Sequence, residues 1–415
     1  MKRVDFITHR VCRACESPNL ELLIDFGNMP LAGGFLRPEE VDTVNIAFPL
    51  RLGRCCDCTV MQVLDTIPPE MIFSQYSYTS STTETLVDHF EEMAGEIVER
   101  HHAKGRLVVE FGCNDGILVR PLIRRGACVI GVDPSDVAAR ASQGQGWTLI
   151  QGYFDEAIAS QILQEYGPAR IIVGNNVFAH VEDIHAFLKG VIALLDSEGV
   201  FIFEVHYQGD LVKLVQFDTV YHEHHYYFSV TSLVKLLGKH GLHIIDVERI
   251  SIHAGSIRVT AARAYSPHSL SSRVEELLEE EKRIDISGFI KQVSNRRDRM
   301  RTLVFGLRKA GKRIAAYGAS GRMTIMLNYC GFGSNIIDYV VDMSPLRFGK
   351  LVLGVLIPIV PPDAFHANPQ DYAIMTAWNY EKEILEKERE FLKNGGRFIV
   401  PLPEIRILQD AAIIS

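Results

Sequence analysis

The sequence predicts an α/β protein in which two parallel-sheet units follow a small cysteine-rich module. Apolar runs of strand length alternate with helix-like stretches from about residue 71 to 265, and a second such series starts at residue 312. This alternation is typical of βαβ units. Two Cys-x-x-Cys pairs precede the first series. Because 415 residues exceed one ordinary domain, we expect two or three domains.

The expected elements follow in chain order. We expect a cysteine-rich module at 1–70, a first α/β unit at 71–265, a charged helical connector at 266–311 and a second α/β unit at 312–415. In the first unit the parallel strands are expected at 106–112, 127–133, 169–176 and 199–205, with a closing hairpin at 242–251 and 256–264. In the second unit strands are expected at 312–320, 336–342, 371–377 and 397–403.

Composition and charge exclude several classes of function. The net charge is −8 without a Lys/Arg cluster, so binding to a nucleic-acid backbone is not expected. The basic N-terminal residues precede no apolar run, and no stretch is apolar enough to span a membrane. Eight cysteines without an export signal indicate a reducing cytoplasm and metal ligation rather than disulfides. Since no exposed heptad or apolar patch is recognisable, we expect a monomer.

Four cysteines predict a structural zinc site. Cys12 and Cys15 form one Cys-x-x-Cys knuckle, and Cys55 and Cys58 form another. Zinc prefers a tetrahedron of soft ligands, and four thiolates leave no open position for catalysis. The 39 residues between the knuckles can hold a pair of strands. Free buried cysteines or a redox pair are the alternatives.

A glycine-containing loop follows the first expected strand. The stretch EFGCNDG lies between that strand and an expected helix at 117–126, where glycines let a ligand approach the backbone. Asparagine at position 114 breaks the G-x-G-x-x-G pattern, which disfavours NAD without excluding it. The pattern E-x-G-x-N-x-G instead resembles the first motif of class I S-adenosylmethionine methyltransferases. It consists of Glu110, Gly112, Asn114 and Gly116.

The next two strands end in residues that fit the same cofactor. Asp133 ends the second strand, where a carboxylate can accept hydrogen bonds from ribose hydroxyls. Asn175 and Asn176 end the third strand, at the place where a methyltransferase keeps polar residues around the methionine part. An ordinary βα turn in a Rossmann-like sheet is the structural alternative, but the ordered set of glycines, Asp and Asn favours cofactor binding.

Residues 221–229, YHEHHYYFS, concentrate groups that can move protons. They follow the strand at 199–205, so we expect them at the carboxyl side of the sheet. Methylation of a carbon needs a carbanion equivalent such as an enolate, which requires a base and oxyanion donors. A metal site is disfavoured because alternate residues of an extended segment point to opposite faces. Packing is expected for Tyr226, Tyr227 and Phe228; isolated histidines such as His206 are expected to be structural or superficial.

Taken together, these motifs resemble the nucleotide-sugar C-3 methyltransferases that make the branched deoxysugars of antibiotics. The resemblance covers essentially the whole chain and depends on the cysteine module, EFGCNDG, NNVFAHVED, YHEH followed by YFS, AYGAS with LNYCG, and TAWNYEKEI. It implies S-adenosylmethionine as cofactor and a thymidine-diphosphate-linked 4-keto sugar as acceptor. It further implies that His224 takes the proton from C-3 and that the enolate carbon attacks the methyl sulfonium.

The resemblance also assigns supporting roles. Tyr221 and Glu223 would hold and polarise the sugar, and His180 would stabilise the enolate or relay a proton. Tyr76 and Tyr78, in SQYSYTSSTTETL, would contact the methionine part of the cofactor, although this stretch also suits a helix cap.

The second α/β unit is expected to hold the substrate's diphosphate. Ser320, Gly321 and Arg322 open a helix after a strand, which makes an anion site from backbone N–H groups and the helix dipole. The family more often has lysine near Arg322 and at Arg347, but arginine also grips phosphate. Trp378 and Asn379 lie at another strand end, where either ligand contact or core packing is plausible.

Two other functions remain open at this point. The departures in the second unit allow S-adenosylmethionine-dependent methylation of a keto acceptor that is not a sugar or carries a different activating group. A zinc-containing scaffold without catalysis is a third hypothesis, which the retained YHEH and EFGCNDG motifs disfavour.

Overall fold

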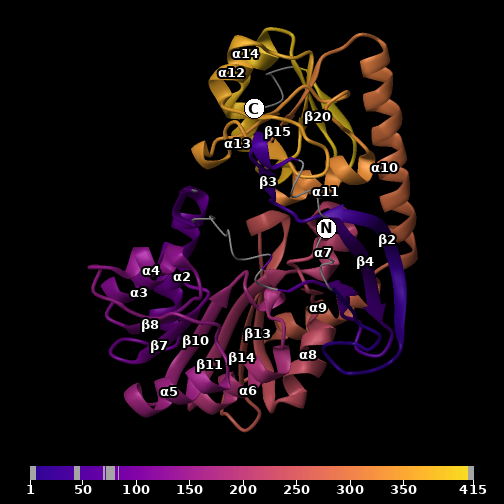
Figure 1. Ribbon diagram of the computed structural model, residues 1–415. Helices are drawn as coiled ribbons and strands as arrows, with labels where there is room; N and C mark the ends of the chain where they lie inside the picture. Colours follow the sequence, from indigo (N-terminus) through magenta and orange to yellow (C-terminus); the bar gives the residue numbers. More distant parts are fainter. Residues whose placement is uncertain (1–5, 42–46, 69–70, 72–79, 83, 410–415) are drawn as a thin grey trace.

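The computed structural model describes residues 6–41, 47–68, 71, 80–82 and 84–409 (Figure 1). Tyr76 and Tyr78 lie outside the described residues, so their predicted cofactor contacts stay predictions. Among the helices described, none is long and apolar enough to cross a membrane.

An antiparallel sheet forms the N-terminal module. Its strands β2 (Leu20–Pro30), β4 (Ala47–Cys55) and β5 (Met61–Val63) are followed in space by β12 (Tyr226–Tyr227), in the order β12-β5-β4-β2. The fourth strand thus comes from the segment YHEHHYYFS. Two short pairings lie beside this sheet: β1 (Ile7–Thr8) with β6 (Asp65–Thr66), and β3 (Phe35–Leu36) with β17 (Leu351–Val352).

The first α/β unit contains a seven-stranded sheet of order β13-β14-β11-β10-β7-β8-β9. Its strands from β9 to β11 are parallel, whereas β14 runs antiparallel to β11 and pairs with β13 as the predicted hairpin. The strands are β7 (Leu107–Phe111), β8 (Cys128–Val132), β9 (Thr148–Ile150), β10 (Ala169–Asn175), β11 (Leu195–His206), β13 (Leu242–Ile250) and β14 (Ser256–Arg263). The predicted α/β fold class is confirmed, with the topological switch between β7 and β10.

Helices cover both faces of this sheet. One face packs against α2 (Glu84–Arg100), α3 (Val119–Arg124) and α4 (Asp136–Ser142). The other packs against α5 (Glu156–Tyr166), α6 (Ile184–Leu194) and α8 (Val230–Lys239). Burial on both faces explains why the parallel strands appear in the sequence as continuous apolar runs.

The charged connector forms two helices, α9 (Ser272–Glu281) and α10 (Ile286–Lys309), and α10 leads to the second unit along one side of the molecule (Figure 1). The second sheet has the order β18-β16-β15-β19-β20-β21, and only β21 is antiparallel. Its strands are β15 (Ile314–Tyr317), β16 (Val340–Val341), β18 (Ile359–Val360), β19 (Tyr372–Met375), β20 (Arg397–Val400) and β21 (Arg406–Leu408). Its helices are α11 (Gly321–Cys330), α12 (Pro362–Ala367), α13 (Glu381–Lys387) and α14 (Arg389–Lys393).

One hydrophobic core joins the N-terminal sheet to the second α/β unit. Leu50 and Leu52 of β4 belong to the same buried cluster as Phe217, Met323 and Ile314. The short helices α7 (Gln208–Lys213) and η4 (Phe217–Thr219) contribute to this shared core. The segment that follows η4 is YHEHHYYFS, which therefore lies where all three parts of the chain meet.

Candidate active site

The segment 221–229 lies at the carboxyl ends of β10 and β11, as the sequence predicts. The N–H of His225 donates to the carbonyl of Ala179, just beyond β10, at 3.0 Å. The N–H of Gln208, just beyond β11, donates to the carbonyl of Phe228 at 2.8 Å. In open α/β sheets this edge is where ligands bind.

The three histidines of the segment point to different places. The segment is a turn closed by the His224 N–H and the Tyr221 carbonyl at 3.0 Å, not the extended chain expected from the sequence. His222 bonds the carbonyl of Pro49, and His225 bonds the carbonyl of Val181. Because each ring is held by a separate carbonyl, the three offer no common position for a metal ion.

His224 has the state that a general base needs. Its Nδ1 lies 2.9 Å from the carbonyl oxygen of Thr219. A carbonyl only accepts hydrogen bonds, so Nδ1 carries the proton and Nε2 keeps its lone pair. Burial lowers the pKa of His224 well below its usual value, and His180 and His206 lower that pKa further. The imidazole is therefore neutral at neutral pH and can accept a proton through Nε2.

Three other rings surround His224. Ring centroids lie 4.9 Å away for His180, 5.0 Å for His206 and 3.9 Å for Tyr221. His180 belongs to η3 (Phe178–His180), and burial lowers its pKa to about 4. The Nδ1 atom of His180 is buried without a hydrogen-bond partner. This arrangement places two imidazoles and a phenol around the candidate base.

The expectation that His206 is a superficial or structural residue stays a prediction, although the structure places it beside the candidate base. His206 ends β11 and is only partly exposed, with its ring against His224. A single histidine has no local pattern that marks it as functional. Its position at the carboxyl end of a buried strand was the available signal, because that edge of the sheet collects ligands.

Glu223 and Tyr221 complete this side of the site. Burial raises the pKa of Glu223 to about 8, so its carboxyl is mostly protonated at neutral pH and can donate a hydrogen bond. A β-carbon on Gly321 would lie 3.5 Å from the Tyr221 ring. The first turn of α11 in the second α/β unit therefore lies against the catalytic segment.

The glycine loop after β7 forms the neighbouring crevice. Gly112 has a φ of +65°, and a β-carbon there would lie 2.3 Å from the Cγ2 atom of Val177. Gly116 has a φ of +77°. Asp133 fixes this loop, because one carboxylate oxygen accepts the N–H of Asn114 at 2.9 Å and the other accepts the N–H of Ser135 at 2.8 Å. Glycine is needed at both positions for the loop to adopt this path.

The crevice also contains polar atoms without protein partners. Both side-chain polar atoms of Asn175, the Oδ1 atom of Asn176 and one carboxyl oxygen of Glu110 are buried without a hydrogen bond. Burial, then Asp133 and Asp115, raises the pKa of Glu110 well above its ordinary value. Buried polar groups are normally paired, so these atoms indicate the position of a polar ligand.

Residues 80–82 close over the glycine loop. The N–H of Ser80 donates to Oδ1 of Asn114 at 3.2 Å, and the N–H of Ser81 donates to Asp115 at 3.1 Å. These contacts bring the end of SQYSYTSSTTETL to the crevice. Ser80 and Ser81 thus contact the glycine loop, whereas the predicted cofactor contacts of Tyr76 and Tyr78 lie outside the described residues.

In the second α/β unit a carboxylate also fixes the loop after the first strand, as Asp133 does in the first unit. Asp342, beyond β16, accepts the N–H of Ala319 at 2.7 Å and that of Ser344 at 2.8 Å. Arg347 pairs with Asp342 at 3.1 Å and lies over the ring of Phe35. Ser320 caps α11 by accepting the N–H of Met323 at 3.4 Å. The predicted anion site at Ser320 and Gly321 is therefore a half-buried helix start near the Arg347–Asp342 pair.

Arg322 and Trp378 turn toward η4 instead of solvent. Arg322 is buried, lies 3.7 Å from a carboxylate oxygen of Asp218 and donates to Gln216 at 3.4 Å. Its guanidinium lies 5.3 Å from the Trp378 ring, and the indole N–H donates to Asp218 at 2.8 Å. Asn379 is the partly exposed neighbour of Trp378 in η7 (Trp378–Tyr380). Trp378 is thus a buried core residue whose indole N–H is hydrogen-bonded to Asp218.

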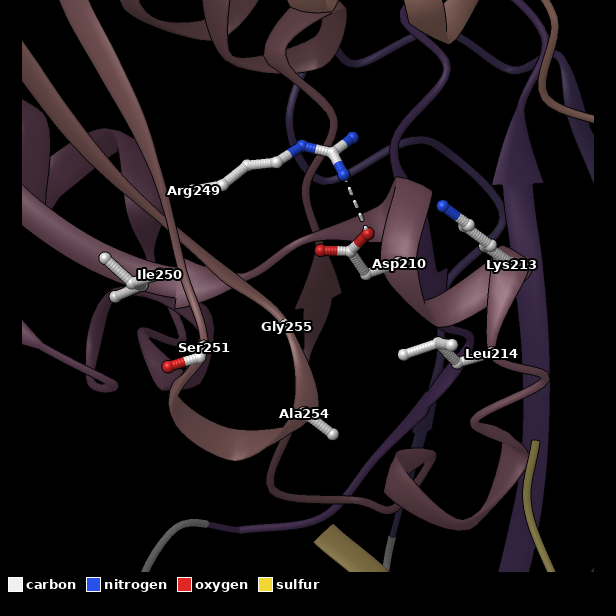
Figure 2. Close-up of a pocket in the computed structure, with 8 residues that line it drawn as sticks. All are labelled: Asp210, Lys213, Leu214, Arg249, Ile250, Ser251, Ala254 and Gly255. Carbon is white, nitrogen blue, oxygen red and sulfur yellow. Dashed lines mark hydrogen bonds and ion pairs between the residues drawn. The ribbon is translucent and has the colours of Figure 1, made fainter. Parts of the chain in front are cut away.

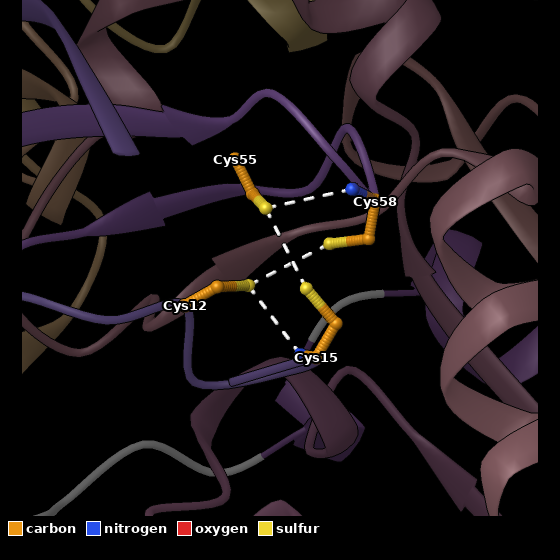
Figure 3. Close-up of side chains that lie close together, drawn as sticks. All are labelled: Cys12, Cys15, Cys55 and Cys58. Carbon is orange, nitrogen blue, oxygen red and sulfur yellow. Dashed lines mark hydrogen bonds between the residues drawn. The ribbon is translucent and has the colours of Figure 1, made fainter. Parts of the chain in front are cut away.

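The four predicted cysteine ligands lie together (Figure 3). Their sulfur atoms are all within 4.8 Å of one another, with Cys12–Cys58 and Cys15–Cys55 separations of 3.5 Å. A zinc ion with Zn–S bonds of about 2.3 Å requires sulfur atoms about 3.8 Å apart. The backbone N–H groups of Cys15 and Cys58 point at the first sulfur of their knuckles. The donor set fits tetrahedral zinc.

A cavity of about 490 Å³ lies elsewhere, between α7 and the turn that joins β13 to β14 (Figure 2). Asp210 and Arg249 form an ion pair across it at 3.2 Å. None of the predicted site residues lines it. The other lining residues are Lys213, Leu214, Ile250, Ser251, Ala254 and Gly255.

Comparisons with known proteins bear on all parts of the chain. Residues 12–73 match a zinc binding domain, residues 82–247 a methyltransferase domain, and residues 251–403 a C-methyltransferase C-terminal domain. The C-methyltransferase NovU of Streptomyces niveus is 38% identical over 404 residues, which cover 96% of each chain.

Other similarities cover less of the molecule. A ubiquinone biosynthesis O-methyltransferase of Bradyrhizobium diazoefficiens is 34% identical over 103 residues, or 24% of this chain and 39% of that protein. The structure of magnesium protoporphyrin IX methyltransferase from Synechocystis matches with a TM-score of 0.34 and 22% identity, covering 43% of this chain and 83% of that one. Only the similarity to NovU, among these three, runs through nearly the whole chain.

Proposed function

The chain belongs to the C-methyltransferase family, and we propose that it methylates C-3 of a thymidine-diphosphate-linked 4-keto-deoxysugar with S-adenosylmethionine as methyl donor. The observation that carries the chemistry is the state of His224. Its Nδ1 is fixed by the Thr219 carbonyl, so its basic Nε2 is available beside two more imidazoles and a phenol. Such a cluster can generate a carbon nucleophile, which transfer to oxygen does not require.

The crevice after β7 fits the cofactor. S-adenosylmethionine, when bound, supplies a methyl group on a positively charged sulfur. Gly112 and Gly116 leave room beside the backbone, and Asp133 offers a carboxylate toward ribose hydroxyls. The unpaired polar atoms of Asn175 and Glu110 provide partners for the amino acid part. The acidic character of this crevice suits a cation.

The chain's own residues prepare the acceptor carbon. His224 Nε2 takes the C-3 proton, and the electrons of that C–H bond move into an enolate whose oxygen is the former ketone. Protonated Glu223 and the Tyr221 hydroxyl donate hydrogen bonds to that oxygen as its negative charge grows. His180, whose pKa of about 4 keeps it neutral, adds a further donor or passes the proton on. The C-3 carbon would then form the new bond to the methyl group as the methyl–sulfur bond breaks, which leaves the neutral thioether S-adenosylhomocysteine.

The second α/β unit supports a diphosphate. The start of α11 at Ser320 and Gly321 is half-buried and lies against the Tyr221 ring, so a sugar beside Tyr221 would carry its phosphates toward this helix start. Arg347 adds positive charge at the same edge. This connection between catalytic segment and helix start favours a nucleotide-linked acceptor.

One observation favours a different keto acceptor. Arg322 and Arg347 were both predicted to bind phosphate, yet both have carboxylate partners, Asp218 and Asp342. Two arginines that are already neutralised leave less positive charge for a diphosphate. A keto compound without a nucleotide is therefore the second candidate.

Calorimetry tests the proposal first. S-adenosylhomocysteine is titrated into the zinc-loaded protein, and thymidine diphosphate is then added. Binding of both ligands is expected. Binding of S-adenosylhomocysteine alone would favour the second candidate, and binding of neither would contradict methyl transfer altogether.

A second experiment examines the chemistry. The protein saturated with S-adenosylhomocysteine is incubated in deuterium oxide with a thymidine-diphosphate-linked 4-keto-6-deoxysugar, and deuterium at C-3 is measured by mass spectrometry. His224-dependent exchange is expected, because proton removal does not require methyl transfer. A bound acceptor that shows no exchange would contradict the enolate mechanism.

A further inference from the structure

The zinc-binding module extends into the active site. Its sheet is completed by β12, where Tyr226 pairs with Gln62 and Tyr227 with Met61. The N–H of Val63 also donates to the carbonyl of His225 at 3.1 Å. The catalytic segment is therefore held on one side by the module that carries the four cysteines.

Arg13 lies inside the first cysteine knuckle and reaches both histidine segments. Its Nη2 donates to the carbonyl of Glu182 at 2.6 Å, two residues after His180. Its guanidinium carbon lies 5.0 Å from the ring centre of Tyr226, two residues after His224. Its backbone N–H donates to Oε1 of Gln62 at 3.0 Å, and Gln62 is the strand partner of Tyr226.

These contacts solve a geometric problem. His180 and His224 come from two separate loops, yet their rings must stay 4.9 Å apart to act on one substrate. Residues between two ligands of one metal ion have little conformational freedom. The backbone of Arg13 is therefore held in one position relative to the zinc site. The guanidinium of Arg13 then fixes one loop by its cation–π contact with Tyr226 and the other by its hydrogen bond to the carbonyl of Glu182.

We infer that Arg13 is a positioning residue: it ties the zinc knuckle to the loops of His180 and His224 and so sets the spacing of the two imidazoles. Displacement of catalytic groups by about 1 Å can reduce turnover about a hundredfold. The module thus does more than stabilise the fold, because its metal-organised knuckle defines active-site geometry. The turnover part of this inference depends on the proposed function, whereas the structural part does not.

The test compares Arg13→Ala with the wild type as zinc-loaded proteins. Turnover is expected to fall about tenfold to a hundredfold, with KM for the keto sugar changed less than kcat. Zinc content and affinity for S-adenosylhomocysteine are expected to stay at the wild-type level. Hydrogen exchange measured by mass spectrometry is expected to accelerate in peptides spanning 177–184 and 221–229, but not in the glycine loop at 106–118.

Two further variants make the result specific. Arg54→Ala removes another arginine of the same sheet, whose contact is with Glu21 on β2, and should leave turnover and exchange unchanged. Arg13→Lys keeps the cation over Tyr226 and should restore part of the turnover. It also serves as the test variant if Arg13→Ala does not accumulate as folded protein.

Three outcomes would overturn the inference. They are turnover of Arg13→Ala within threefold of wild type, unchanged exchange in both histidine peptides, or an equal loss of S-adenosylhomocysteine binding, which would indicate general destabilisation. If the wild type itself shows no turnover with the keto sugar, the proposed function fails. The exchange measurement still decides the role of Arg13 in that case.

Discussion

The two α/β units build the same loop-and-carboxylate arrangement and surround it with different charged groups. In each, a carboxylate beyond the second strand holds a backbone N–H of the loop after the first strand: Asp133 accepts from Asn114, and Asp342 accepts from Ala319. In the first crevice Glu110 and Asp115 add further carboxyl groups. In the second, Arg347 pairs with the carboxylate itself.

One backbone arrangement thus carries two different sets of charged side chains. Loop and carboxylate geometry provide a place for a ligand at the topological switch. Under the proposed function, the carboxyl groups of the first crevice would face a sulfonium, and the second crevice, where Arg347 is paired with Asp342, would face phosphates. The catalytic segment 221–229 lies between them, and Tyr221 contacts the second unit at Gly321.

The largest effect is expected from removing the proposed general base. His224→Asn should lower kcat by about 10²-fold or more, as loss of a general base does, because asparagine cannot accept the C-3 proton. Affinity for S-adenosylhomocysteine should stay unchanged, since the first crevice is intact. Steady-state kinetics and calorimetry check the two quantities. Nearly unchanged turnover would show that His224 is not the base.

Separate substitution of Asp133 and Asp342 tests whether ligand binding at the two crevices is independent. Asp133→Asn should weaken S-adenosylhomocysteine binding about tenfold or more, because a hydrogen bond to a charged acceptor contributes about 1.5–3 kcal/mol. Asp342→Asn removes the carboxylate that balances Arg347 and should strengthen thymidine diphosphate binding without affecting the first ligand. Both affinities are measured for both variants. If each variant weakened both ligands equally, the two crevices would form one coupled site.

The pH dependence separates the base from the acid. Burial lowers the pKa of His224 below its usual value, so loss of activity on acidification should have its midpoint below pH 6.5. Burial raises the pKa of Glu223 to about 8, so its donor form is present below that pH and is lost as the pH rises through it. The quantity kcat/KM should therefore also fall above about pH 8.

Glu223→Gln sharpens this prediction. The amide still donates a hydrogen bond but does not titrate, so the fall in kcat/KM above about pH 8 should disappear while the plateau changes less than about tenfold. Profiles of wild type and variant, recorded with the same acceptor, provide the check. An alkaline limb that persists in the variant would assign it to another group.

The sequence allowed much of the fold to be predicted because its strands are buried on both faces. The runs at 106–112 and 127–133 correspond to β7 and β8, and the expected hairpin is β13 with β14. The two-residue strand β12 could not be predicted, since its partner β5 lies far away in the chain. Two residues have no periodicity, and only tertiary contact makes them a strand.

The candidate site also has parts that the sequence predicts and parts that it does not. The glycine loop and Asp133 follow strands directly, and the histidine segment follows β11 after two short helices, so local sequence predicted where they gather. The orientation of Arg322 was not predictable, because Asp218 and Trp378, which hold it, lie far from it in sequence. Similarly, the position of His206 against His224 depends on how β11 and the later turn meet. Charge partners and ring contacts of this kind exist only after folding.

The smallest effect is expected at the edge of the second crevice. Arg347 is partly exposed and its charge is already balanced by Asp342, so it contributes less to anion binding than an unpaired arginine would. Arg347→Met should weaken thymidine diphosphate binding about threefold to tenfold, while S-adenosylhomocysteine binding and kcat at saturating acceptor stay unchanged. Calorimetry at two salt concentrations measures this effect, which should shrink at high salt because exposed charges are screened. The exposed Lys393→Met, whose partner is Glu390 on α14, is the control for the loss of one paired surface charge elsewhere in the second unit. If both variants weakened nucleotide binding equally, the effect would come from the overall charge of the protein. Arg347 would then have no specific role in anion binding at the second crevice.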